Sequence, residues 1–243
     1  MTKRDYRRRA DTSAKSFRRT LYAKEPAGSA ILVVTEGANT EPSYFDRIRN
    51  HLAAPTVELV PHGAGRGDPR ALADEALRLR KERKSQMRDK KLGINRLEDF
   101  DAIWIVFDTD VVTPQKRTEG IAYAESKGIQ IAYSEPCFEF WLLIHQAFTT
   151  APMAKCKDVI PYLAEHLGWK GYARIGKRQQ QIEEWVRLLV DKASIRQAVA
   201  HAEKIRRHHK EANTAFPANP STDVDHLIRA INAAVSPANR FLG

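Results

Sequence analysis

The run AIWIVFDTD, residues 102–110, constrains the fold more than any other part of the chain. Residues 103–107 are apolar without a break, and all are β-branched or aromatic, the types that fit a pleated sheet. Such a short run predicts a strand that is covered on both faces, as in a parallel sheet. Asp108 and Asp110 follow at the end of this strand, where open α/β sheets bind their ligands. Two acids held there can share a hard divalent cation, although one of them also suits the cap of the next helix.

Strand and helix patterns alternate through the first part of the chain. Apolar runs predict strands at residues 29–35, 56–60, 100–107 and 129–134. A helical pattern follows each of them, beginning at Thr40, at Pro69, near residue 119, and over CFEFWLLIHQAF, residues 137–148. This alternation predicts a Rossmann-like, mostly parallel α/β sheet flanked by helices.

The end of the chain has a different pattern. After about residue 151 no strand is predicted, and helices are expected near residues 159–167, 180–190, 194–210 and 223–234. Ser221 or Thr222 is expected to cap the last of these helices, with Asp223 in its first turn. We therefore expect a basic arm over residues 1–28, an α/β domain over residues 29–150, and a helical region over residues 151–243 that packs on that domain.

Basic residues gather in two segments of a chain whose net charge is +10. Residues 1–24 and residues 78–96 each hold nine Lys or Arg and two acids, so each segment carries a net charge of +7. Clustered basic charge indicates nucleic acid as a partner, although a solvated helix face or a tail that aids solubility explains it as well. Neither segment has the apolar stripe of a membrane-surface helix. The expected nucleic-acid contacts are Arg7, Arg8, Arg9, Arg18, Arg19, Arg80, Arg83, Lys84, Lys177 and Arg178.

The chain carries few signs of export or of membrane insertion. No apolar run approaches the roughly 18 residues of a membrane helix, and the basic N-terminus lacks the apolar core of a signal peptide. The two cysteines, Cys137 and Cys156, make neither a disulfide framework nor a zinc site, and Cys137 is expected to be a small core residue. We therefore expect a protein of the reducing cytoplasm.

Six acids stand beside predicted strand ends; Glu135 ends the last strand and Glu139 lies one turn into the next helix, and the other four are the metal candidates. Glu36 ends the first strand, Glu41 lies in the first turn of the next helix, and Asp108 and Asp110 end the central strand. Parallel strands bring these ends to one edge of the sheet, so the four acids are predicted to hold one or two Mg²⁺ ions, for which Mn²⁺ substitutes. Two metals about 4 Å apart stabilise the attacking and leaving oxygens in phosphodiester cleavage. Glu41 alone is also explained as a complement to the helix dipole.

Other candidates have weaker support. Glu139 and His145 lie in the last apolar helix pattern, where they either support the four acids or serve as an exposed residue and a buried residue of that helix. Lys177 and Arg178 either clamp a phosphate or belong to a surface patch. The loop HGAGRGDPR, residues 62–70, lets backbone amides approach a phosphate, but it fits no dinucleotide or P-loop spacing, and a turn before a helix is favoured.

Several motifs resemble those of a known family. VVTEGANTEPSYF, residues 33–45, resembles the Toprim signature, in which a glutamate ends the first strand before a glycine, and FDTD, residues 107–110, resembles the Toprim acid pair. With RRR in the basic arm, YSEPCFEFWLLIH at residues 133–145 and NPSTDV at residues 219–224, the chain resembles the RloB-like family over most of its length. That family commonly has Asn where this chain has Glu135, which indicates that this position need not be acidic.

The resemblance implies a Toprim fold, similar to that of overcoming-lysogenization-defect nucleases, and a metal-dependent nuclease-like centre. It makes Glu36 a metal ligand or general acid/base, Glu41 a further ligand, and Asp108 and Asp110 the metal-binding pair. RloB-like genes are associated with restriction–modification loci and phage abortive infection, so the resemblance also implies a role in phage defence, with a partner protein of a defence operon as one prospect.

Three functions are therefore compared. The favoured one is a Mg²⁺-dependent nuclease that cleaves DNA or RNA. The second is a non-catalytic nucleic-acid-binding sensor or subunit of a defence system. The third is a haloacid-dehalogenase-like phosphatase, because IVFDTDVV fits a motif in which Asp108 attacks phosphate and Asp110 acts as acid/base; however, that motif usually opens its domain, and here a strand, a glutamate and a helix precede it. The apolar C-terminal helices are also able to support a homodimer.

Overall fold

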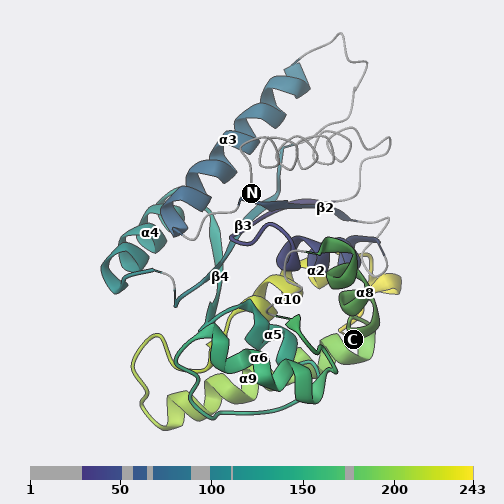
Figure 1. The fold of residues 1–243 in the computed structure, drawn as a ribbon. Helices are drawn as coiled ribbons and strands as arrows, with labels where there is room; N and C mark the ends of the chain where they lie inside the picture. Colours follow the sequence, from purple (N-terminus) through teal and green to yellow (C-terminus); the bar gives the residue numbers. More distant parts are fainter. Residues whose placement is uncertain are drawn as a thin grey trace.

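The computed structural model describes residues 29–50, 57–64, 68–88, 99–110, 112–172 and 178–242 (Figure 1). The predicted basic arm with Arg7, Arg8, Arg9, Arg18 and Arg19, the centre of the glycine-bearing loop, and Lys177 lie outside the described residues. All four acids that are predicted to hold Mg²⁺ lie inside the described ranges.

The structure contains one five-stranded sheet in the order β2-β1-β3-β4-β5. The first four strands run parallel to their neighbours, whereas β5 is antiparallel to β4. Their bounds are β1 Ser29–Thr35, β2 Val57–Gly63, β3 Ala102–Asp108, β4 Gln130–Glu135 and β5 Ser221–Thr222. The predicted α/β fold with a mostly parallel sheet is confirmed.

Strand β5 corrects the prediction that no strand follows residue 151. It pairs Ser221 with Glu135 and Thr222 with Ser134, and the Ser134 and Thr222 hydroxyl groups lie 2.9 Å apart. Two polar residues produce no apolar run, so nothing local indicates this strand. The last helix therefore has Asp223 as its N-cap residue rather than Ser221 or Thr222, although Thr222 Oγ1 still accepts a hydrogen bond from the Val224 amide.

Helices cover both faces of the sheet (Figure 1). Helices α3 and α4 pack on one face, and α2 with the C-terminal helices packs on the other. The described α-helices are α2 Thr40–Ile48, α3 Pro69–Arg88, α4 Pro114–Ser126, α5 Phe138–Leu143, α6 Cys156–His166, α8 Gln179–Leu189, α9 Lys192–Glu211 and α10 Val224–Ala234, followed by the short 3₁₀ helix η3 Pro237–Asn239. No helix in the described ranges combines the length and the apolar character needed to cross a membrane.

Two cores explain why the strands are apolar without alternation. In β1, Ile31 and Val33 face the core under α2 and the C-terminal helices, whereas Leu32 and Val34 face the core under α3. Successive side chains of a strand point to opposite faces, so a strand covered on both sides must be apolar at every position. The same division holds in β3, and the covered faces leave the carboxyl ends of the strands as the place for polar side chains.

Helix α5 is shorter than its apolar pattern predicts. It ends at Leu143, and the chain turns through residues 144–146, so His145 lies beyond the helix rather than two turns inside it. Ile144 and His145 are nevertheless fully buried. The apolar pattern therefore continues past the helix because burial, and not helical structure, continues there.

Candidate metal centre

The ends of β1 and β3 are tied together at the acidic edge of the sheet. The Glu36 amide donates to the Val106 carbonyl oxygen at 2.9 Å, and the Asp108 amide donates to Glu36 Oε2 at 2.9 Å. Glu36 therefore follows β1 and reaches across to the last residue of β3. The parallel register of β1 and β3 causes this meeting, because it ends both strands at the same edge.

The four predicted acids share one arrangement: in each, one carboxylate oxygen accepts a backbone amide. Besides the bond to Glu36, the Gly37 amide donates to Glu41 Oε1 at 2.8 Å and the Phe138 amide donates to Asp108 Oδ1 at 2.9 Å. The Cys156 amide donates to Asp110 Oδ2 at 3.0 Å. These bonds orient the carboxylates, and a metal site needs ligands that are oriented in this way.

Gly37 makes the Glu41 contact sterically feasible. A Cβ atom at position 37 would collide with the Glu41 carboxylate, which lies directly against the Gly37 backbone. The Glu-Gly pair after β1 is thus explained by the close approach of a second acid from the first turn of α2. The glycine after the strand is a packing requirement of the acidic edge.

A fifth acid, Glu139, joins the group from the first turn of α5. Burial raises the pKa of Asp108 well above its ordinary value, and the charges of Glu139, Glu41 and Glu36 raise it further. Burial and the charge of Glu139 raise the pKa of Glu41 to about 7. The pKa values of Glu36 and Glu139 are raised too, first by burial, and the charge of Asp110 contributes to both. The acids are therefore close enough to repel one another.

No cation of the chain balances this charge within the described ranges. None of the ion pairs formed there by Lys, Arg or His includes Glu36, Glu41, Asp108, Asp110 or Glu139. An oxygen-only donor set of this kind suits a hard divalent cation such as Mg²⁺. No three of these acids have carboxylate oxygens that all lie within 4.8 Å of one another in the described structure. Repulsion between like charges favours this separation.

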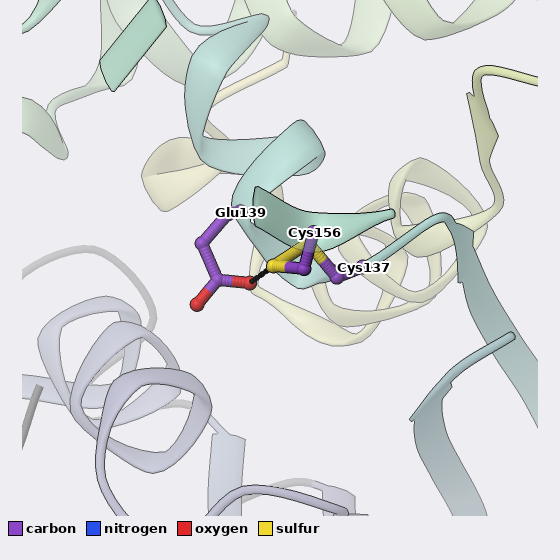
Figure 2. A group of neighbouring side chains, drawn as sticks. All are labelled: Cys137, Glu139 and Cys156. Carbon is purple, nitrogen blue, oxygen red and sulfur yellow. Dashed lines mark hydrogen bonds between the residues drawn. A yellow bond between two sulfur atoms is a disulfide. The ribbon is translucent and has the colours of Figure 1, made fainter. Parts of the chain in front are cut away.

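The sequence predicts neither a disulfide framework nor a zinc site for the two cysteines, but the structure joins them in one disulfide. Cys137 precedes α5, Cys156 begins α6, and the two form a disulfide although they are 19 residues apart in the chain. Glu139 points toward this disulfide, with its Oε2 atom 3.1 Å from Cys156 Sγ (Figure 2). Two cysteines gave no framework from spacing alone; the packing of α5 beside α6 brings them together. The expectation that Cys137 is a small core residue is confirmed, because it is fully buried.

Tyr172 is a contact that sequence reasoning missed. Its hydroxyl group donates to Glu139 Oε1 at 2.7 Å and lies 2.9 Å from Thr40 Oγ1. Glu139 is therefore a partly buried, hydrogen-bonded acid and not an exposed helix residue. Tyr172 lies 33 residues beyond Glu139, and no motif or periodicity relates the two positions.

The structure does not place His145 against the acids. Its Nε2 atom lies 3.2 Å from the Tyr44 hydroxyl group and its Nδ1 atom lies 3.2 Å from Ser194 Oγ. Burial lowers the pKa of this imidazole to about 3, so it is neutral. The predicted supporting role of His145 at the acidic edge is replaced by a structural role in the core between α2 and α9.

Glu135 also has hydrogen-bond partners within the fold. Its carboxylate accepts hydrogen bonds from the Thr109 hydroxyl group and, at 2.8 Å, from Asn219 Nδ2. Asn219 in turn contacts the Met153 backbone through its amide oxygen and nitrogen. Glu135 thus fastens the segment before β5 to the end of β4.

The basic side chains of α3 that are predicted to contact nucleic acid already have partners within the protein. Arg80 forms a two-pronged hydrogen bond with the Asp99 carboxylate, and Lys84 Nζ lies 3.0 Å from the same group. Arg83 is 1% exposed, with its guanidinium group 4.3 Å from the centre of the Phe100 ring. Arg83 is thus packed inside the protein, and its predicted contact with nucleic acid stays a prediction. Arg178, the N-cap residue of α8, is exposed, and its predicted role stays a prediction.

The acids gather at the carboxyl edge of an α/β sheet, and no basic side chain of the described ranges pairs with them. This arrangement defines a class of α/β protein with a candidate cation site at its strand ends. A family model described as RloB-like protein matches residues 31–231, which is most of the chain. The chain therefore belongs to the RloB-like family. It matches none of the curated proteins and none of the solved structures with which it was compared.

Proposed function

We propose that this chain is a metal-dependent nuclease with a Toprim-type centre, in which Glu36, Glu41, Asp108 and Asp110 hold Mg²⁺. The single observation that carries the proposal is the gathering of five acids with no paired cation in the described part of the chain. A divalent cation supplies the missing positive charge and, in phosphodiester cleavage, stabilises the charge that develops on the reacting oxygens.

The chain's own residues have separable roles in this proposal. Asp108 and Asp110 are fixed by amides at the starts of α5 and α6, so they are the oriented ligands. Glu41 is the most buried of the four and supplies a ligand from α2. Glu36 reaches across from β1, and burial raises its pKa, which suits a group that holds a metal or accepts a proton.

The substrate in this proposal is the phosphodiester backbone of DNA or RNA. A net charge of +10 favours a polyanion. The relation to overcoming-lysogenization-defect nucleases, and a role in phage defence with abortive infection, are part of the proposal because RloB-like proteins are associated with such loci. Within the described residues, no lysine pairs with Asp108, which favours a metal centre over a phosphatase that uses this aspartate as nucleophile.

The test compares Asp108→Asn with the wild type. Both are incubated with Mg²⁺ or Mn²⁺ and a panel of single-stranded DNA, double-stranded DNA and total RNA, and Mn²⁺ binding is measured by calorimetry. We expect metal-dependent cleavage by the wild type and a loss of at least about 100-fold in the variant, since one charged ligand is gone. Glu165→Gln is the matched control, because this acid is 70% exposed and takes no part in the acidic edge.

The outcomes separate the candidate functions. Mn²⁺ binding that requires Asp108, without cleavage of any substrate, would favour a sensor that binds metal but does not cut. Unchanged Mn²⁺ affinity in Asp108→Asn would contradict the metal centre itself. Release of inorganic phosphate from a small phosphate ester, lost in the variant, would favour the phosphatase.

A further inference from the structure

Two cysteine sulfurs and one carboxylate oxygen lie close together where α5 and α6 begin. Cys137, Glu139 and Cys156 each offer one ligand atom, and these atoms all lie within 4.8 Å of one another (Figure 2). Among the described residues, no other three His, Cys, Asp or Glu side chains bring their ligand atoms this close together. The donor set of two sulfurs and one carboxylate oxygen differs from the oxygen-only set of the acidic edge.

The Glu139 contact is unusual for a disulfide. Its Oε2 atom lies 3.1 Å from Cys156 Sγ, but a cysteine in a disulfide has no proton to donate. The contact becomes favourable when the sulfur carries a proton or when a cation lies between the two atoms. No positively charged side chain of the described ranges pairs with Glu139.

The surroundings hold the three donors in place. The Tyr172 hydroxyl group donates to Glu139 Oε1 at 2.7 Å, which leaves Oε2 directed toward the sulfurs. The Phe138 amide, next to Cys137, donates to the Asp108 carboxylate, and the Cys156 amide donates to the Asp110 carboxylate. A carboxylate ligand with its own hydrogen-bond donor is typical of metal sites in proteins.

We propose that, in the dithiol form of the protein, Cys137, Glu139 and Cys156 bind a Zn²⁺-class cation, and that formation of the disulfide abolishes this site. Three protein ligands with a fourth position left for water or another ligand is a recurrent zinc arrangement. A dithiol reductant supplies two electrons and two protons, is itself oxidised to a disulfide, and leaves two thiols on the protein; binding of the cation then releases the two thiol protons. This site does not depend on the proposed nuclease activity.

The consequence is a link between redox state and metal content beside the acidic edge. Zn–S bonds of about 2.3 Å in a tetrahedral site place the two sulfurs close to 4 Å apart, so a modest separation of the α5 and α6 starts accommodates the ion. A small-molecule disulfide accepts the two electrons of the thiolates, takes up two protons to become two thiols, and so returns the protein sulfurs to a covalent bond, which removes both thiolate ligands at once.

Co²⁺ is the probe for this proposal, because its thiolate complexes absorb in the near-ultraviolet whereas carboxylate complexes do not. The full chain is reduced with a phosphine, which is oxidised to its oxide while water supplies the protons, and two free thiols are counted before Co²⁺ is added. We expect one Co²⁺ per chain with a thiolate-to-metal band, displaced by one equivalent of Zn²⁺. The oxidised protein is expected to show no such band.

Two variants make the result specific. Cys156→Ser is expected to lose the band, and Tyr172→Phe is expected to keep it while affinity falls about tenfold; circular dichroism checks that both fold. The double variant Glu36→Gln/Glu41→Gln changes two acids of the edge whose hydrogen bonds go to Asp108 and Gly37 rather than to the cysteines, and it is expected to keep the band, which distinguishes this site from the acidic edge. The proposal is overturned if the folded chain yields no free thiols under the phosphine, if the reduced wild type lacks the band, or if Cys156→Ser retains it.

Discussion

Two regions of this protein bury acids, and they treat the charge in opposite ways. Asp225 in the first turn of α10 is fully buried, and both of its carboxylate oxygens accept hydrogen bonds from Arg206 at 2.6 Å. Glu41 at the acidic edge is 7% exposed, but its close charged neighbours are the carboxylates Glu139 and Glu36. The same fold thus pairs one buried acid with an arginine and surrounds the other with acids.

The difference teaches how to distinguish a structural acid from a functional one. A buried carboxylate that serves stability needs an opposite charge and hydrogen bonds from the chain itself, as Asp225 has. The acidic edge lacks such a partner in the described ranges, and burial raises the pKa values of Glu36, Glu41, Asp108 and Glu139. Repulsion that the fold tolerates in this way is characteristic of a site that something else completes.

The largest effect that we expect concerns the paired acid. Asp225→Asn removes the charge of the closer of the two acids beside the half-buried Arg206 and leaves only Asp223, at 3.6 Å, so the free energy of unfolding should fall by about 2–4 kcal/mol. Urea denaturation followed by circular dichroism measures this loss. Glu203→Gln is the matched control, because Glu203 pairs with Arg229 on the surface and should cost under about 0.5 kcal/mol. Equal losses in the two variants would remove the contrast on which the comparison rests.

The corresponding change at the acidic edge should have the opposite sign. Glu41→Gln keeps an oxygen for the Gly37 amide but removes a charge that its neighbours repel. We therefore expect metal-free Glu41→Gln to be more stable than the wild type by about 1–3 kcal/mol at pH 8. At pH 8 the wild type should also gain more stability from Mn²⁺ than the variant does.

The pH dependence of this effect follows from the raised pKa of Glu41. The folded protein holds the proton up to about pH 7, whereas the unfolded chain releases it near pH 4.5. The folded state therefore binds more protons in this window, and the stability of the metal-free wild type should fall as pH rises through it. The advantage of Glu41→Gln should vanish at pH 4. An advantage that is constant with pH would show that packing, not charge, causes it.

The smallest effect concerns a partly exposed paired acid, Asp99. Burial alone would raise its pKa, but hydrogen bonds from Arg80 and Lys84 lower it to about 2. Asp99→Asn should cost about 0.5–1 kcal/mol, and less at high salt, because these side chains are partly in water. The variant also frees Arg80 and Lys84, so it should bind DNA or RNA more tightly if those residues contact phosphate. Unchanged affinity would make the Arg80–Asp99 contact purely structural.

Much of the fold was determined by the sequence itself. The predicted first strand, residues 29–35, coincides with β1, and the helix predicted to begin at Pro69 is confirmed as α3, with Leu72, Ala76 and Leu79 buried. Such elements are predictable because burial on two faces imposes a local pattern on strands and a periodic one on helices. The parallel sheet then places Glu36 and Asp108 together without further information.

Only the tertiary structure decided the remainder. The contacts of Glu139 with Tyr172 and with the Cys137–Cys156 disulfide join α5 to residues 17 and 33 positions away, and the packing of Arg83 on the Phe100 ring joins residues 17 positions apart. Strand β5 exists because β4 offers it a partner. None of these features has a local pattern, since each depends on which helix packs beside which strand. Local periodicity specified most of the apolar strands and helices, whereas long-range packing decided β5, the end of α5 and the partners of the polar side chains at the strand ends.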